Sequence, residues 1–234
     1  MAAHKTILSW SSGKDSAFAL HELRQMPEYE VIGLLTTLNQ VHDRVAMHAV
    51  RRTLLHAQAR AAALPLVEID LPYPCSNEEY EARMRGFVER ALALGVTHVA
   101  FGDLFLADVR AYRERQLAGT GLTPVFPLWG RPTPALAREM LAAGLRARLT
   151  CVDPRQISAS FAGREFDEAL LADLPSSADP CGERGEFHTF VWAGPMFREP
   201  LRVVPGEVVE RDGFVFADVL PGADFGATGA ARPS

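Results

Sequence analysis

Hydrophobic and polar positions along the first half of the chain form two alternating kinds of segment, one typical of strands and one of helices. Short apolar runs of strand type occur at 6–10, 31–35, 65–69 and 98–101. Each is followed by a stretch with apolar residues at helical spacing, at 17–23, 44–63, 76–94 and 106–117. Repeated strand–helix units predict an α/β fold, in which a parallel sheet is flanked by helices.

The pattern changes after about Thr123, where prolines fall close together at 124, 127, 132 and 134. Helices are expected from Thr133 to a stop at Gly144 and at 166–174. Strands are predicted at 145–152, 187–192, 201–204, 208–211 and 214–220, with Asp212-Gly213 as a hairpin turn. We therefore expect a first domain at 1–123, a smaller α+β domain at 124–221 and a tail rich in glycine and alanine at 222–234.

The loop between the first strand and the first helix carries the strongest chemical signal. It matches neither a Walker A loop nor G-x-G-x-x-G, and reads Ser9-Trp10-Ser11-Ser12-Gly13-Lys14-Asp15-Ser16. The start of a helix offers unpaired N–H groups and a partial positive charge, which favour a phosphate. We expect phosphate binding by Ser11, Ser12, Gly13, Lys14, Asp15 and Ser16, with a positive φ at Gly13 and an ordinary backbone conformation at Ser12.

The amino-acid usage favours a specific role for Lys14. Of the 24 basic residues, two are lysines, Lys5 and Lys14, and the other 22 are arginines. If only positive charge mattered at position 14, arginine would be the expected residue. The alternative is an ordinary turn of serine and glycine, with Lys14 and Asp15 as solvated residues of the first helical turn.

The overall composition predicts a soluble cytoplasmic protein. The 234 residues are 48% hydrophobic and 23% charged, with a net charge of -5 that gives no reason to expect nucleic-acid binding. The chain lacks the apolar run of about 18 residues that a membrane span needs, and its N-terminus lacks a secretory signal. The wide spacing of Cys75, Cys151 and Cys181 indicates a reducing compartment, without a disulfide framework or a structural zinc site.

A second group of polar residues follows the fourth strand. Gly102 and Asp103 come at the end of that strand, on the sheet edge that carries the phosphate loop. Arg110, Arg113 and Glu114 follow at i, i+3 and i+4 on one helical face. We expect Asp103 near ATP and magnesium, and the arginines near phosphate or an acidic substrate. The alternative is a strand turn and a helix surface with an ion pair.

Two further segments carry acid–base groups. The loop at 179–189 contains Glu183, Glu186 and His188, which supply general acid–base groups within a few residues. Cys181 in the same loop is a candidate nucleophile, although Arg184 is the only strong positive neighbour that would lower the pKa of its thiol. Arg44 and His48, after the second strand, predict a substrate-facing loop. The alternative for the loop at 179–189 is a charged loop that leads into a strand. The alternative for Arg44 and His48 is a solvated helix start.

The order of these segments resembles a known family. S-S-G-K-D-S matches, at five of six positions, the S-G-G-K-D-S pyrophosphate loop of the adenine-nucleotide alpha-hydrolase-like enzymes. It is followed by R-x-x-M-H, G-D, P-L-W-G-R and D-P-C-G-E-R-G-E-F-H-T. Together these elements resemble the diphthine–ammonia ligase family, also called the ATP-binding diphthamide synthase domain. The resemblance runs from about Lys5 to Leu201.

The resemblance implies a HUP-type nucleotide-binding domain and a second domain that carries the G-E-x-G-E loop. It implies an ATP-dependent ligase that forms an amide from a carboxylate and ammonia through an acyl-adenylate, and releases AMP and pyrophosphate. Lys14, Asp103, Glu183 and Glu186 would be catalytic. The substrate-binding set would be Arg44, His48, Arg110, Arg113, Glu114, Glu183, Glu186 and His188. Magnesium would come with ATP near Asp103, without a metal site built by the protein alone.

The sequence identifies neither the acceptor acid nor the oligomeric state. The preference for arginine is typical of GC-rich coding and indicates a bacterial source. Because bacteria do not make diphthamide, the acceptor would there be a small molecule instead of a protein. A homodimer is compatible with the sequence. The alternative functions are tRNA modification, which predicts paired cysteines or a basic face, and a nucleotide sensor without turnover.

Overall fold

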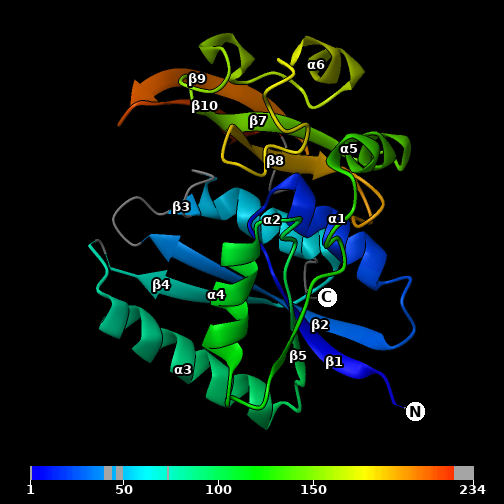
Figure 1. Cartoon of the computed structure of the whole chain (residues 1–234), viewed down its shortest axis with the longest axis vertical. Helices are drawn as coiled ribbons and strands as arrows, with labels where there is room; N and C mark the ends of the chain where they lie inside the picture. The colour runs from blue at the N-terminus through cyan, green and yellow to red at the C-terminus, as the bar shows by residue number, and fades with distance from the viewer. Residues whose placement is uncertain (1, 40–43, 46–49, 73, 224–234) are drawn as a thin grey trace, which may run out of the picture.

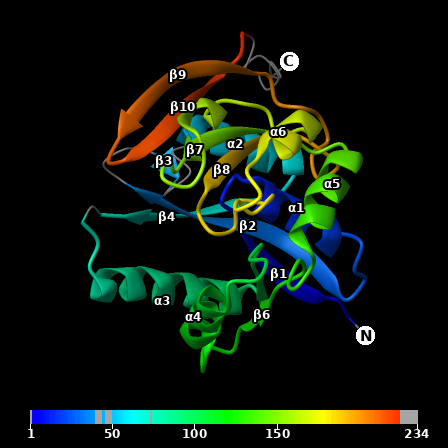
Figure 2. The same ribbon diagram turned by 45° about the horizontal axis from the view of Figure 1, so that its top comes forward.

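The computed structural model describes residues 2–39, 44–45, 50–72 and 74–223, which form two sheets with helices packed around them (Figure 1). Helices α1 (Lys14–Leu23) and α2 (Arg52–Ala62) lie between the two sheets. Helices α3 (Asn77–Ala93) and α4 (Ala107–Leu117) cover the opposite face of the first sheet (Figure 2). The predicted α/β fold with a smaller second domain is confirmed.

The parallel strands of the first sheet run in the order β4-β2-β1-β5-β6. Their bounds are His4–Ser9 for β1, Tyr29–Asn39 for β2, Leu66–Leu71 for β4, His98–Ala100 for β5 and Thr123–Val125 for β6. The chain moves from β1 to β2 on one side, and later returns to β5 on the other side of β1. In open α/β sheets, ligands bind at the carboxyl ends of the strands where the order reverses. The fold therefore places a binding crevice after β1 and β5.

The predicted helix at 44–63 is wrong in its first part. Strand β3 (Arg44–Val45) pairs antiparallel with Leu38 and Asn39 at the end of β2, and α2 begins only at Arg52. Pairing with β2 gives the backbone groups of β3 hydrogen-bond partners. This tertiary contact outweighs the local preference of the segment for a helix. The other predicted helices of this half agree with the structure, and Ser76 caps α3 by accepting a hydrogen bond from Glu79 N at 3.1 Å.

Strand β6 lies at the boundary that the sequence suggested after residue 123. It pairs with β5 through Thr123, Pro124 and Val125, which makes it an edge strand of the first sheet. An edge strand tolerates proline because one side of its backbone needs no partner. The division at 123 stays a prediction, although β6 continues the first sheet beyond it.

The second sheet is antiparallel, in the order β8-β7-β10-β9. Its strands are β7 (Arg146–Val152), β8 (Phe187–Ala193), β9 (Val203–Arg211) and β10 (Phe214–Pro221), and its helices are α5 (Thr133–Ala142) and α6 (Glu168–Asp173). Strand β9 is continuous where two strands were predicted, since Pro205 lies on an edge strand. Asp212 and Gly213 form the predicted hairpin turn, with φ angles of 54° and 78°.

The hydrophobic core joins the second domain to one face of the first. One buried cluster includes Leu20 of α1, Leu54 of α2, and Leu149 and Phe190 of the second sheet. A separate cluster lies under α3 and α4, and contains Ile7 and Phe101. Because the first cluster is shared, burial of apolar surface fixes the second domain against the helix that carries the phosphate loop.

Within the described part of the chain, no helix combines the length and the apolar character that a membrane crossing requires.

Candidate functional site

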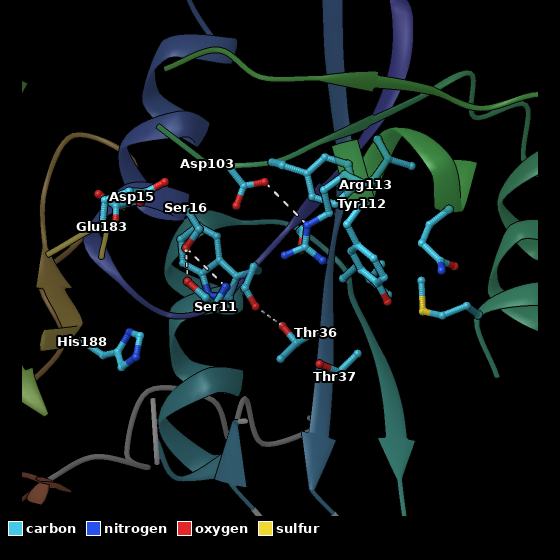
Figure 3. A pocket seen from close by; sticks show the side chains of 18 of the residues that line it. Ser11, Asp15, Ser16, Thr36, Thr37, Asp103, Tyr112, Arg113, Glu183 and His188 are labelled. Carbon is cyan, nitrogen blue, oxygen red and sulfur yellow. Dashed lines mark hydrogen bonds and ion pairs between the residues drawn. The ribbon is translucent and has the colours of Figure 1, made fainter. Parts of the chain in front are cut away.

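A pocket of about 380 Å³ opens at the carboxyl ends of β1, β2 and β5 (Figure 3). Its walls come from the loop after β1, the end of β2, helices α3 and α4, and the segments 182–183 and 187–189 of the second domain. Apolar side chains of α3 and of the segment after β5, Met84, Phe87 and Phe101, line it together with polar groups. Apolar walls that carry convergent polar groups are typical of a site for a small molecule.

The loop after β1 has the expected position, but two backbone predictions were wrong. Gly13 has φ -87°, whereas Ser12 has φ 72°. The left-handed turn at Ser12 directs its carbonyl oxygen to Val191 N of β8, at 3.0 Å. Ser12 therefore occupies the position at which a glycine would be free of strain.

We expect Ser12→Gly to raise the free energy of unfolding by about 1 kcal/mol, since a left-handed non-glycine residue costs roughly 1–2 kcal/mol. The Oγ of Ser12 is also buried, and has no hydrogen-bond partner among the described residues. Urea unfolding measures the change. The matched control is Ser11→Gly, which removes the 3.1 Å hydrogen bond between the hydroxyls of Ser11 and Ser16 and should destabilise the protein. An equal loss of unfolding free energy in both variants would show that Ser12 is not strained.

Lys14 lies deep between the two domains, with 2% of its side chain exposed. Its Nζ donates to Asp15 Oδ2 at 2.9 Å and to the carbonyl of Cys181, and lies over the ring of Phe187 at 5.4 Å. Burial disfavours the charged ammonium and by itself would lower the pKa of Lys14. The attraction of the Asp15 carboxylate opposes this effect, and the net result is a pKa of Lys14 raised above its usual value. The side chain is therefore a buried, permanently charged group on the wall of the pocket, which excludes the alternative of a solvated first-turn residue.

Gly102 brings the end of β5 against the phosphate loop. A Cβ atom at this position would lie 2.8 Å from Asp15 C and from Ser16 N, closer than side-chain atoms approach backbone. Asp103 follows and faces Arg113 of α4, with 3.6 Å between Oδ2 and Nε (Figure 3). Both atoms are buried and lack a hydrogen bond within the described residues, so the ion pair is the contact that holds these two side chains together. Burial raises the pKa of Asp103, while Arg113 opposes the shift.

The loop before β8 is held by two buried carboxylates. Asp179 accepts a hydrogen bond from Cys181 N at 2.8 Å and from Thr133 Oγ1 at 2.6 Å. Glu186 accepts from Asp179 N at 2.7 Å and from Arg184 N at 3.0 Å. Glu186 thus holds the backbone of the loop, and it is absent from the residues that line the pocket. The structure gives it a different position from the catalytic one that we expected.

Glu183 is the carboxylate of this loop that faces the pocket (Figure 3). Its Oε1 accepts a hydrogen bond from Leu104 N at 2.8 Å, which links the second domain to the segment after β5. Burial, together with the charges of Asp15 and Asp103, raises the pKa of Glu183 to about 7 against the hydrogen bond from Leu104. A carboxyl group with this pKa exchanges protons near neutral pH.

Two other groups of the loop have shifted pKa values. Burial and the charge of Lys14 lower the pKa of His188, which lines the pocket, to about 4. The imidazole is therefore neutral at pH 7. Burial raises the pKa of the Cys181 thiol to about 12, so this cysteine stays protonated and does not act as a nucleophile.

Some predicted site residues lie elsewhere. Arg110 forms an ion pair with Glu114 at 2.8 Å and stacks on Trp129, and neither charged residue lines the pocket. The exposed ion pair is the alternative that we had considered for this helix face, whereas Arg113 points into the pocket. Arg44 lies in β3, and His48 lies outside the described residues.

Several residues of the pocket were not predicted from the sequence. Tyr80 of α3 and Tyr112 and Gln116 of α4 line it, together with Thr36 and Thr37 at the end of β2. The only available signal was their position, since helices and strand ends of an α/β sheet contribute to the crevice. Across the residues with described positions, no three His, Cys, Asp or Glu side chains are grouped to hold a metal ion.

Comparisons with known proteins match nearly the whole chain. A sequence model of the diphthamide synthase N-terminal domain matches residues 4–124, and one of the diphthamide synthase C-terminal domain matches residues 133–217. Proteins named diphthine–ammonia ligase are similar to the chain. The one from Danio rerio is 26% identical over 231 residues, which cover 89% of this chain and 90% of that protein.

Two further proteins of the same name show similar agreement. The one from Rattus norvegicus is 28% identical over 236 residues, covering 89% of this chain and 86% of that protein. The one from Schizosaccharomyces pombe is 24% identical over 220 residues, or 86% of this chain. The chain spans only 36% of the length of this yeast protein.

Proposed function

The chain belongs to the diphthamide synthase family, and on this basis we propose that it is an ATP-dependent ligase that joins ammonia to a carboxylate. The observation that carries the proposal is the pocket after β1 and β5, where Ser11, Lys14, Asp15 and Ser16 lie opposite Glu183 of the second domain, while Ser12 and Gly13 are absent from its lining. The apolar residues Met84, Phe87 and Phe101 suit an adenine ring, and the start of α1 suits the phosphates.

The chemistry follows from the groups around the pocket. An oxygen of the acceptor carboxylate attacks the α-phosphorus of ATP, and the bond to the β-phosphate breaks to release pyrophosphate. The start of α1 and the ammonium of Lys14 stabilise the charge that develops on this leaving group. Arg113 lines the pocket, and its guanidinium is suited to the acceptor carboxylate.

Amide formation then needs a base. Ammonia attacks the carbonyl carbon of the acyl-adenylate, AMP leaves with the attacking carboxylate oxygen, and the surplus proton of the nitrogen goes to Glu183. A carboxylate with a pKa near 7 is suited to accept it.

Magnesium fits as a companion of ATP. Asp103 lines the pocket, and Mg²⁺ is usually held by one or two carboxylates together with substrate phosphates. The ion would neutralise phosphate charge when bound. The acceptor is, in this proposal, a small carboxylic acid in a bacterial setting.

The expected products test this function. Incubation with ATP, ammonium and a panel of carboxylic acids should release AMP and pyrophosphate. An acid labelled with ¹⁸O in its carboxylate should transfer one ¹⁸O to AMP. Acid-dependent exchange of labelled pyrophosphate into ATP should occur without ammonium. Release of ADP, with ¹⁸O in inorganic phosphate, would contradict the acyl-adenylate route. Binding of ATP without turnover of any acid would favour a nucleotide sensor.

A further inference from the structure

A buried glutamine connects the phosphate loop to both domains. Gln58 of α2 is 0% exposed and lies beneath the loop. Its Nε2 donates to Ser12 O at 3.0 Å and to Val191 O of β8 at 2.7 Å. Its Oε1 accepts from Trp10 Nε1 at 2.9 Å. One side chain therefore contacts the end of β1, the left-handed residue of the loop and a strand of the second domain.

The chemistry of these partners fixes the orientation of the Gln58 amide. The indole N–H of Trp10 can only donate, so the atom of Gln58 that faces it is the oxygen. The carbonyl oxygens of Ser12 and Val191 can only accept, so the atom between them is the nitrogen. Glutamate would place an oxygen against two carbonyl oxygens, and methionine would leave all three groups without this partner.

The strained residue of the loop depends on these contacts. The carbonyl of Ser12 accepts hydrogen bonds from Gln58 and from Val191 N, both at 3.0 Å. A serine keeps a φ of 72° only where its surroundings impose it. The next residues are tied to the same strand, because Lys14 N donates to Thr189 Oγ1 at 3.0 Å. The phosphate loop therefore does not hold its shape by itself.

We propose that Gln58 is a positioning residue for the proposed reaction: it fixes the left-handed turn at Ser12, and thereby the shape in which the loop grips the phosphates. It does not line the pocket and touches no reacting atom. It acts on the part of the site that binds pyrophosphate, and not on the apolar part at Met84 and Phe101. Its loss should weaken ligands with a terminal pyrophosphate, and leave AMP unaffected.

The test compares Gln58→Met with Leu54→Val. Leu54 is a fully buried residue one turn earlier in α2 and away from the pocket, so its variant loses stability without touching the loop. Calorimetry with ATP, AMP and inorganic pyrophosphate should show Kd values for ATP and pyrophosphate raised by about tenfold or more in Gln58→Met, the scale expected of a misplaced binding group. The Kd for AMP should stay within about twofold, and Leu54→Val should match the wild type. Equal weakening of all three ligands, or no change, overturns the proposal.

Hydrogen exchange provides a readout that needs no ligand. Amides of the segment 10–16 should exchange faster in Gln58→Met than in Leu54→Val at equal overall stability, and equal exchange overturns the proposal. Gln58→Asn, which keeps a neutral amide but is one methylene too short to reach the same partners, is the second variant if Gln58→Met does not fold. The inference on ligands rests on the proposed function. Wild-type protein that binds neither ATP nor pyrophosphate refutes that function, and hydrogen exchange then decides on Gln58 alone.

Discussion

Lys14→Met is expected to reduce the release of AMP and pyrophosphate by about 10²–10³-fold, the usual effect of removing one group that stabilises transition-state charge. Methionine replaces the apolar stem of the side chain and removes the charge in the phosphate loop. The remaining activity is measured as pyrophosphate released at saturating ATP, with circular dichroism to verify folding. Retention of more than a tenth of the wild-type rate would exclude the proposed role of Lys14.

The chain offers a matched control for this variant. Lys5 is the other lysine, and lies on β1 with its Nζ exposed and 3.4 Å from Leu94 O, so Lys5→Met should leave the activity unchanged. Lys14→Arg should not restore activity. The longer, planar guanidinium does not fit the enclosed space between Asp15, the Cys181 carbonyl and the ring of Phe187. Full activity of Lys14→Arg would show that charge alone is required.

Glu183→Gln is expected to lower kcat by about 10²–10⁴-fold, the usual contribution of a general base. The amide oxygen can still accept the hydrogen bond from Leu104 N, so the loop should keep its position. Because the ionised carboxylate accepts the proton, kcat/KM of the wild type should rise with pH through about 7 and then level off. The variant should lack this rise when the concentration of free ammonia is held constant.

The same substitution should make the protein more stable at alkaline pH. The pKa of Glu183 is raised from 4.5 to about 7 in the folded state, so the folded protein holds this proton more tightly than the unfolded chain. The free energy of unfolding therefore falls as pH rises from 4.5 to 7, while the folded protein still holds this proton. Above pH 7 the full cost of burying the ionised carboxylate remains. Glu183→Gln removes the penalty, and urea unfolding should show a gain over wild type at pH 8 that shrinks toward pH 5.

Glu114→Gln is the control for both measurements. Glu114 lies on the outer side of α4 in an ion pair with Arg110, and does not line the pocket. Its substitution should change neither the pH profile nor the pH dependence of stability. A similar loss of activity in the two variants would point to a general effect of charge and would refute Glu183 as the base.

Local sequence signals predicted most of the first domain. The strand–helix alternation arises from spacing within single segments, so it does not depend on distant contacts. The capping serine at Ser76 and the hairpin at Asp212-Gly213 are likewise local, because their chemistry acts over a few residues. The segment at 44–45 failed for the opposite reason, since pairing with β2 decided its conformation.

The sequence by itself determined the alternation of strands and helices in the first domain and the polar residues that follow its strands, from Ser11 to Ser16 and at Gly102-Asp103. Only the tertiary structure decided which neighbouring side chains share a function. Glu183 enters the pocket while Glu186 binds backbone amides, and Arg113 enters while Arg110 stays on the surface. The left-handed turn at Ser12 depends on Gln58 and Val191, which are far away in sequence. Spacing fixes where a residue lies along a segment, but the direction and surroundings of its side chain are set by the packing of segments that the chain brings together only on folding.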